Sequence, residues 1–94
     1  MRVIHKFGPY NPHEIFTIED VHKLVHFDVQ DGGLFIWCER DKENLRKREA
    51  TFLIVGTGWD YEPVFEHRQS LIQGPYVWHL LEITDPWERM AKLF

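Results

Sequence analysis

Apolar and polar residues alternate along residues 21–30, and this pattern predicts a β-strand. Asp31-Gly32 follows, a pair typical of a two-residue hairpin loop with positive φ angles. A returning strand over residues 33–38 would then place its apolar residues opposite those of the first strand. The predicted pairs are Val25 with Cys38, Phe27 with Ile36 and Val29 with Leu34 on one face, and His26 with Trp37 and Asp28 with Phe35 on the other.

A second hairpin is predicted around Gly74-Pro75, which interrupts two β-rich runs at residues 68–73 and 76–83. Proline has no backbone N–H to donate to a sheet, which suits a turn. If Gly74-Pro75 forms a two-residue loop, Ser70 lies opposite His79 on the neighbouring strand.

Three further strands are predicted at residues 2–7, 14–18 and 50–55. Residues 50–55 are apolar at nearly every position, so this strand is expected near the centre of a sheet with both faces covered. Together with the two hairpins, these strands predict an all-β fold. We expect a small sandwich or barrel of about six or seven mostly antiparallel strands.

The spacing of apolar residues changes near the end of the chain to that of a short amphipathic helix. Asp85 suits the cap of such a helix, and Pro86 suits its first position. The apolar stripe consists of Trp87, Met90, Ala91 and Phe94. Because few residues remain to cover this stripe, Trp87, Met90 and Phe94 are the expected interface of a homo-oligomer.

Length and composition restrict the classes of function. The 94 residues suffice for one domain, with a β core over residues 1–84 and the helix over residues 85–94. The net charge of −4 argues against nucleic acid, whose phosphates require clustered Lys and Arg. No apolar run approaches the length of a transmembrane helix, and the first residues lack a secretory leader pattern. Cys38, the only cysteine, is predicted to be an inert core thiol, and the expected location is the cytoplasm.

Residues 39–49 form a run of mostly charged side chains of both signs, typical of a solvated loop or a one-turn helix. Within this run, Arg46, Lys47 and Arg48 form a local basic cluster on an acidic protein. This cluster offers an alternative interpretation, contact with a phosphate or an acidic partner. The mixed signs favour the solvated loop.

Gly56-Thr57-Gly58 raises the question of a nucleotide site. The motif lacks the Lys and Ser/Thr of a phosphate-binding loop and the longer glycine spacing of a dinucleotide fingerprint. The favoured interpretation is a bulge or tight turn where a buried strand leaves the core, with Trp59 and Tyr61 folded back over it. The alternative is a site in which backbone N–H groups and these aromatic rings bind a flat polar ligand.

The six histidines include candidates for a metal site and for a catalytic base. His22 and His26 have the spacing that chelates on a helix, but on a strand they lie roughly 13 Å apart, too far to share an ion. No metal and no cofactor is therefore predicted. Ser70 opposite His79 resembles a nucleophile and its base, but no orienting acid is placed beside them, so binding is favoured over catalysis.

The order of three segments, 34–41, 48–58 and 70–82, resembles a family of short uncharacterised proteins of bacteriophages and prophages. The residues that carry this resemblance are Trp37, Arg48, Gly56, Thr57, Gly58, His79 and Glu82. The resemblance covers about residues 2–83 and implies a viral accessory protein without a known activity. The predicted C-terminal helix extends beyond the family pattern.

The favoured hypothesis is a non-enzymatic, phage-type accessory protein that binds a host protein or sequesters a small polar ligand. Four Trp, seven Phe and three Tyr are difficult to bury entirely in 94 residues, which favours binding surfaces. The candidate ligand-binding residues are Arg48, Gly56, Thr57, Gly58, Trp59, Tyr61 and His79. Two alternatives are a structural or assembly component of a virion and a small hydrolase that uses His79.

Overall fold

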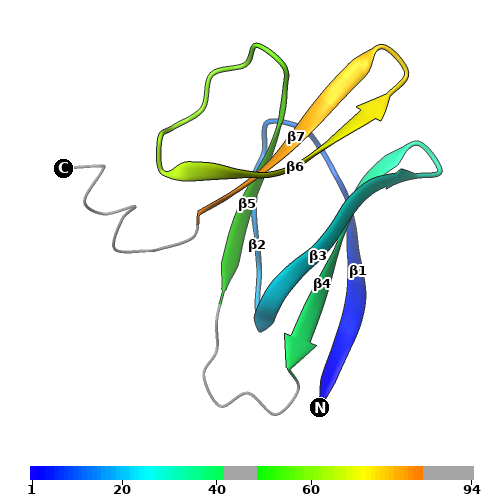
Figure 1. Cartoon of the computed structure of the whole chain (residues 1–94), viewed down its shortest axis with the longest axis vertical. Coiled ribbons are helices and arrows are strands. Elements are labelled where there is room, and N and C mark those ends of the chain that lie inside the picture. Colours follow the sequence, from blue (N-terminus) through cyan, green and yellow to red (C-terminus); the bar gives the residue numbers. More distant parts are fainter. Residues whose placement is uncertain (42–48, 84–94) are drawn as a thin grey trace.

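Residues 1–41 and 49–83 are described by the computed structural model, and over these residues the chain forms seven strands in two sheets (Figure 1). The all-β prediction is therefore confirmed. The strands are β1 (Arg2–Tyr10), β2 (Ile15–Ile18), β3 (Val21–Gln30), β4 (Gly33–Asp41), β5 (Ala50–Gly56), β6 (Phe65–Gln73) and β7 (Tyr76–Ile83). One sheet has the order β1-β4-β3 and the other β2-β5-β7-β6, and all paired strands are antiparallel.

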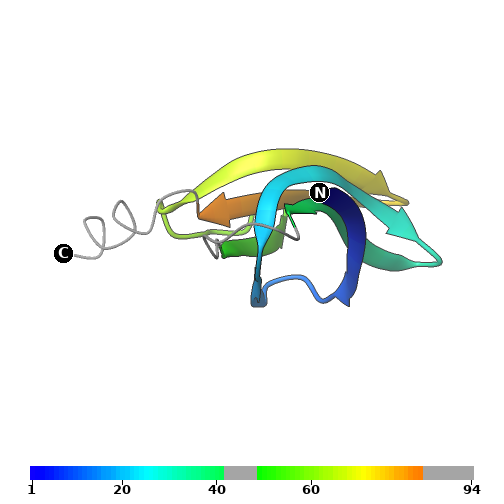
Figure 2. The ribbon, with the colours of Figure 1, turned by 90° about the horizontal axis from the view of Figure 1, so that it is seen from below.

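The main hydrophobic core lies between the two sheets, because its residues come from both. Phe27, Ile36 and Cys38 contribute from the three-stranded sheet, and Phe52, Ile54 and Leu80 contribute from the four-stranded sheet. The strands, notably β1 and β3, bend strongly around this core (Figure 2). Cys38 is fully buried, and this burial raises the pKa of its thiol to about 12. The predicted inert core cysteine is confirmed.

Strand β5 has the central, doubly covered position that its sequence predicts. It lies between β2 and β7, and its residues Phe52 and Ile54 face the main core. Leu53 and Val55 point to the opposite face, where they pack with Val64, Phe65 and Leu81 in a second cluster. The four-stranded sheet thus has an inner face against the other sheet and an outer face with its own small apolar core.

The β3–β4 hairpin has the predicted two-residue loop, with φ of 51° at Asp31 and 80° at Gly32. The predicted pairs are also present from Val29 with Leu34 to His26 with Trp37. The predicted pairing of Val25 with Cys38 is wrong, because Leu24 is the partner of Cys38. The register shifts between Leu24 and His26, so Val25 is an extra bulged residue and is 43% exposed.

The β6–β7 hairpin also has the predicted register, with Gln73 opposite Tyr76 and Ser70 opposite His79. Strand β6 begins three residues earlier than predicted, at Phe65. The tips of the two hairpins point the same way (Figure 1), and Gln73 Nε2 donates to the carbonyl oxygen of Gly32 at 3.2 Å. The hairpins are thus joined at their ends.

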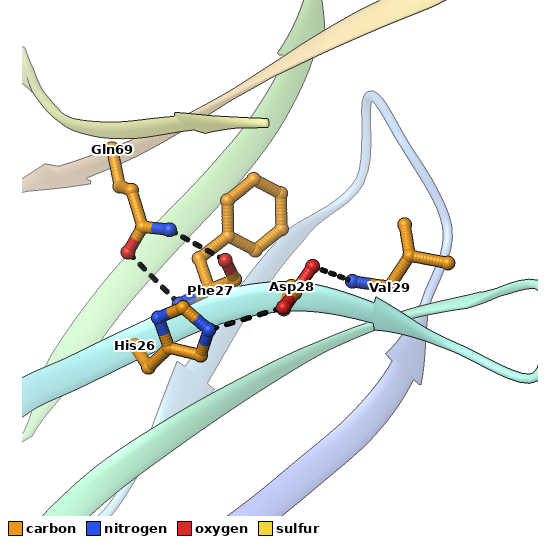
Figure 3. A network of polar contacts seen from close by, with 5 residues as sticks. All are labelled: His26, Phe27, Asp28, Val29 and Gln69. Atoms are coloured by element: carbon orange, nitrogen blue, oxygen red, sulfur yellow. Dashed lines mark hydrogen bonds and ion pairs between the residues drawn. The ribbon is translucent and has the colours of Figure 1, made fainter. Parts of the chain in front are cut away.

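The two sheets meet along a pair of edge strands, β3 and β6. Gln69 reaches from β6 to the backbone of β3: its Oε1 accepts from Phe27 N at 2.9 Å, and its Nε2 donates to Phe27 O at 2.5 Å (Figure 3). Asp28 Oδ1 accepts from Val29 N at 2.7 Å, so side chains satisfy the outward backbone groups of β3 here. The Val29 N–H, aided by His26, lowers the pKa of the Asp28 carboxyl.

Three predictions fall wholly or partly on residues 42–48 and 84–94, which lie outside the described residues. These are the charged loop with Arg46, Lys47 and Arg48, the C-terminal helix, and the interface of Trp87, Met90 and Phe94. Within the described segments, no helix has the length and apolar character required to cross a membrane.

Candidate functional site

The Gly56-Thr57-Gly58 segment forms the predicted tight turn where β5 leaves the sheet. Trp59 N donates to Gly56 O at 3.3 Å, and Gly58 has a φ of 90°. A positive φ at the third residue of a four-residue turn is the requirement of a type II turn, which glycine meets without strain. The turn directs the following residues back across the outer face of the four-stranded sheet.

Trp59 folds back over Gly56, as the sequence predicts. A Cβ atom on Gly56 would lie 3.1 Å from Trp59 Cδ1, so the absence of a side chain permits this close approach. The indole also lies near His13, whose ring centroid lies 4.0 Å away at an interplanar angle of 35°. His13 is held there by its backbone, since its N–H donates to Ile54 O at 2.8 Å.

A pocket of about 250 Å³ opens beside this turn, and we call it the histidine pocket. Its floor is apolar, because Val55 and Leu81 are 3% and 1% exposed. Trp59 and Tyr61 lie at its rim and are 60% and 48% exposed. The lining residues are Val55, Gly56, Thr57, Gly58, Trp59, Tyr61, His67, His79 and Leu81.

Six of the seven candidate ligand-binding residues therefore come together in one place. The seventh, Arg48, lies outside the described residues.

The sequence did not indicate His67 as a pocket residue, because a regular hairpin would pair it with Glu82, on the inner face of the sheet. The register shifts between His67 and Gln69, so His67 pairs with Leu81 and joins the outer face. The sequence offers no clear signal for this bulge.

Four polar side chains form a continuous hydrogen-bonded chain in and beside the histidine pocket. Thr57 Oγ1 lies 2.7 Å from His79 Nε2, and His79 Nδ1 lies 2.7 Å from Ser70 Oγ. Ser70 Oγ in turn lies 2.8 Å from His67 Nε2. With neutral imidazoles the chain can run in either sense, since each hydroxyl both donates and accepts and each ring has one donor and one acceptor nitrogen. Thr57 can therefore present either a donor or a lone pair to a ligand.

The polar partners of His79 in this pocket are two hydroxyl groups. Ser70 and His79 are close enough for a nucleophile and its base, but the second ring nitrogen of His79 meets the hydroxyl of Thr57. In serine hydrolases that nitrogen is held by a carboxylate, which orients the ring and stabilises its cation. Among the described residues, the pocket lining includes no Asp, Glu, Lys or Arg.

His22 and His26, the pair with the spacing that chelates on a helix, contact different acids. His22 Nε2 lies 3.8 Å from Glu39 Oε1, whereas His26 Nε2 lies 3.2 Å from Asp28 Oδ2. In the two described stretches of the chain, no group of three or more His, Cys, Asp or Glu side chains is arranged to hold a metal ion.

Residues 1–90 match a family described as Domain of unknown function (DUF7352). The chain belongs to this family. No curated protein and no solved structure matches the chain. The match identifies a family and neither an activity nor a source, so the bacteriophage setting stays a prediction.

Within this DUF7352 chain, five of the seven residues that carried the resemblance lie on the four-stranded sheet or in the turn that follows β5. Trp37 lies on β4 of the other sheet, and Arg48 lies outside the described residues. Gly56, Thr57, Gly58 and His79 line the histidine pocket on the outer face. Glu82 is only 8% exposed and accepts from Arg68 Nε at 3.1 Å. This part-buried ion pair gives Glu82 a structural partner away from the pocket.

Proposed function

We propose that this protein is a non-enzymatic binding protein that holds a small, neutral, planar polar ligand in the histidine pocket. The observation that carries this proposal is the Thr57–His79–Ser70–His67 chain beside two exposed aromatic rings, Trp59 and Tyr61. Aromatic rings bind the faces of flat ligands, and a hydroxyl or imidazole at the edge fixes their orientation.

Size and charge narrow the ligand further. A volume of about 250 Å³ lies below the roughly 300 to 1,000 Å³ of pockets for drug-sized ligands, which favours a single ring or fused ring pair. A phosphate or carboxylate would enter without a Lys or Arg among the described lining residues, and desolvation of an unpaired charge is costly. A concave site of this size fits a small ligand better than a host protein, the other partner expected from the sequence.

The biological setting that we propose is a phage-type accessory protein that acts by sequestering its ligand. The support is the resemblance itself, because four of its seven residues line the histidine pocket. Sequestration requires a site that binds its ligand without converting it. This agrees with the position of the Thr57 hydroxyl beside His79, where a hydrolase would have a carboxylate.

Native mass spectrometry of freshly purified protein tests whether a ligand from the producing cell is retained. In parallel, nicotinamide and nicotinate serve as matched probes, since they share a ring and differ in charge. We expect nicotinamide to shift the NMR signals of residues 56–61 and to bind roughly tenfold more tightly than nicotinate. No retained mass together with no shift at the pocket would refute the proposal.

A hydrolase is the second candidate, favoured by the 2.7 Å separation of Ser70 Oγ and His79 Nδ1. The test is cleavage of p-nitrophenyl acetate by the wild type and by Ser70→Ala. A hydrolase would form an acyl-enzyme and lose its turnover in the variant. We expect neither a burst nor a difference between the two proteins.

Self-association through Trp87, Met90 and Phe94 stays part of the proposal and rests on the sequence alone. Deletion of residues 85–94 should lower the solution mass while the β-type circular dichroism spectrum persists. An unchanged assembly mass would place the interface elsewhere.

A further inference from the structure

A second pocket of about 310 Å³ lies on the outer face of the four-stranded sheet, and Tyr61 lines both it and the histidine pocket. We call it the acidic pocket. Its lining residues are His13, Ile15, Leu53, Asp60, Tyr61, Glu62 and Phe65.

The floor of the acidic pocket is apolar. Leu53 and Phe65 belong to the second hydrophobic cluster and are 8% and 6% exposed. Ile15, the cross-strand partner of Leu53, is 62% exposed, so an apolar side chain stands uncovered at the edge of this pocket. Such a surface favours a ligand with an apolar part that covers Ile15 and contacts Leu53.

Two side chains of the lining, Asp60 and Glu62, carry a negative charge. Asp60 and Glu62 flank Tyr61 in the sequence, and among the described residues neither carboxylate forms an ion pair with Lys or Arg. Four other acids of the described part do form such pairs: Glu39 with Arg2, Asp20 with Arg40, and Glu66 and Glu82 with Arg68. The two carboxylates of the acidic pocket therefore stay available to a cation from outside.

The tyrosine ring adds a third feature that favours a cation. A positive charge is attracted to the face of an aromatic ring, and the attraction grows when the site is partly desolvated. Tyr61 is 48% exposed and stands between the two acids in the chain. An apolar floor, an aromatic wall and unpaired carboxylates form the combination that recognises an organic ammonium rather than a hydrated metal ion.

We propose that the acidic pocket binds a primary organic ammonium, with the charged group near Asp60, Glu62 and Tyr61 and the apolar stem on Leu53, Phe65 and Ile15. This site shares Tyr61 with the histidine pocket but differs from it in its two carboxylates and in the charge of its ligand. It does not depend on the function proposed above.

The test uses three probes that share a phenyl ring and a short stem: phenethylammonium, 2-phenylethanol and 3-phenylpropanoate. Binding to the full-length protein is followed by amide NMR titration at neutral pH. We expect phenethylammonium to shift the signals of residues 60–65 and of Ile15, with an affinity roughly fivefold or more above that of the alcohol. The carboxylate should bind most weakly. Equal affinities of the ammonium and the alcohol would overturn the proposal.

Variants locate the site. Asp60→Asn with Glu62→Gln should reduce the affinity for phenethylammonium roughly fivefold or more. Glu19→Gln, which removes one negative charge at an exposed position elsewhere, should leave the affinity unchanged. Both are surface substitutions, and the amide spectrum verifies that the fold is retained. An unchanged affinity in the double variant, or the same loss in Glu19→Gln, would refute the site. Thr57→Val disrupts only the histidine pocket, so it should preserve ammonium binding.

Discussion

The edge between β3 and β6 and the outer face of the four-stranded sheet use polar side chains in opposite ways. At the edge, Gln69 and Asp28 bond to backbone groups of β3 (Figure 3). On the outer face, Thr57, His79 and Ser70 bond to one another beside exposed aromatic rings. Buried backbone groups need hydrogen-bond partners for the fold to persist. Side chains that bond to one another at the surface can instead exchange those partners for water or a ligand. The difference separates the residues that hold the sheets together from those that form a site.

The largest expected effect is the loss of Gln69, which joins the sheets. Gln69→Leu would leave Phe27 N and Phe27 O without their partner at a part-buried position. An unsatisfied buried backbone group costs about 1 to 3 kcal/mol, so the free energy of unfolding should fall by about 2 to 4 kcal/mol. Urea unfolding measures this change. Gln30→Leu, at an exposed position, is the control and should change stability by less than about 0.5 kcal/mol. Similar values for both variants would contradict the bridging role.

A smaller loss of stability is expected for a substitution at the tip of the β3–β4 hairpin. Gly32 has a φ of 80°, and a Cβ there would meet no atom within 4 Å, so only backbone strain opposes a side chain. Gly32→Val should destabilise by more than about 1 kcal/mol, because a β-branched residue tolerates positive φ poorly. Gly32→Asn should cost less, since Asn adopts this conformation more readily. Equal melting temperatures for wild type and Gly32→Val would show that the loop does not require glycine.

On the outer face, removal of one hydroxyl should affect binding more than stability. Thr57→Val keeps the shape of the side chain and removes its hydrogen bond to His79, so the free energy of unfolding should change by less than about 1 kcal/mol. The affinity for nicotinamide, measured by NMR titration, should fall roughly tenfold. If Thr57→Val destabilises the protein as much as Gln69→Leu does, the hydrogen bonds of Thr57, His79 and Ser70 are structural. The contrast between the two regions then fails.

The smallest effect concerns acid stability at the edge. The pKa of Asp28 is lowered in the folded protein by the Val29 N–H and then by His26. The stabilisation is therefore present above the ordinary Asp pKa near 4 and is lost as pH falls through the lower folded value. Thermal melts between pH 5 and 2 should show a shallower loss for Asp28→Asn, whose amide oxygen can still accept from Val29 N. A parallel profile would assign the acid sensitivity to other groups.

Several features were available from the sequence because they are local. Asp31-Gly32 and Gly74-Pro75 specified two loops and their registers, and the apolar run of β5 specified a strand covered on both faces. The Gly56-Thr57-Gly58 turn followed from the need for a positive φ. Six of the seven candidate residues also meet in one pocket. They do so because β5 pairs with β7, a pairing that the sequence analysis did not predict.

Bulges account for part of what the sequence did not determine. One extra residue at Val25 ended the predicted alternation of β3, and another near Arg68 moved His67 to the outer face. Glycine marks one type of bulge, but no glycine lies near Val25 or Arg68, so the sequence offers no signal for either bulge. The sequence alone thus determined the strands and their loops. Only the tertiary structure decided the bridge from Gln69 to Phe27 and the pairing of β5 with β7 that brings Thr57 to His79, because both are contacts between segments distant in the chain. It also decided the bulge in β6 that brings His67 to the pocket.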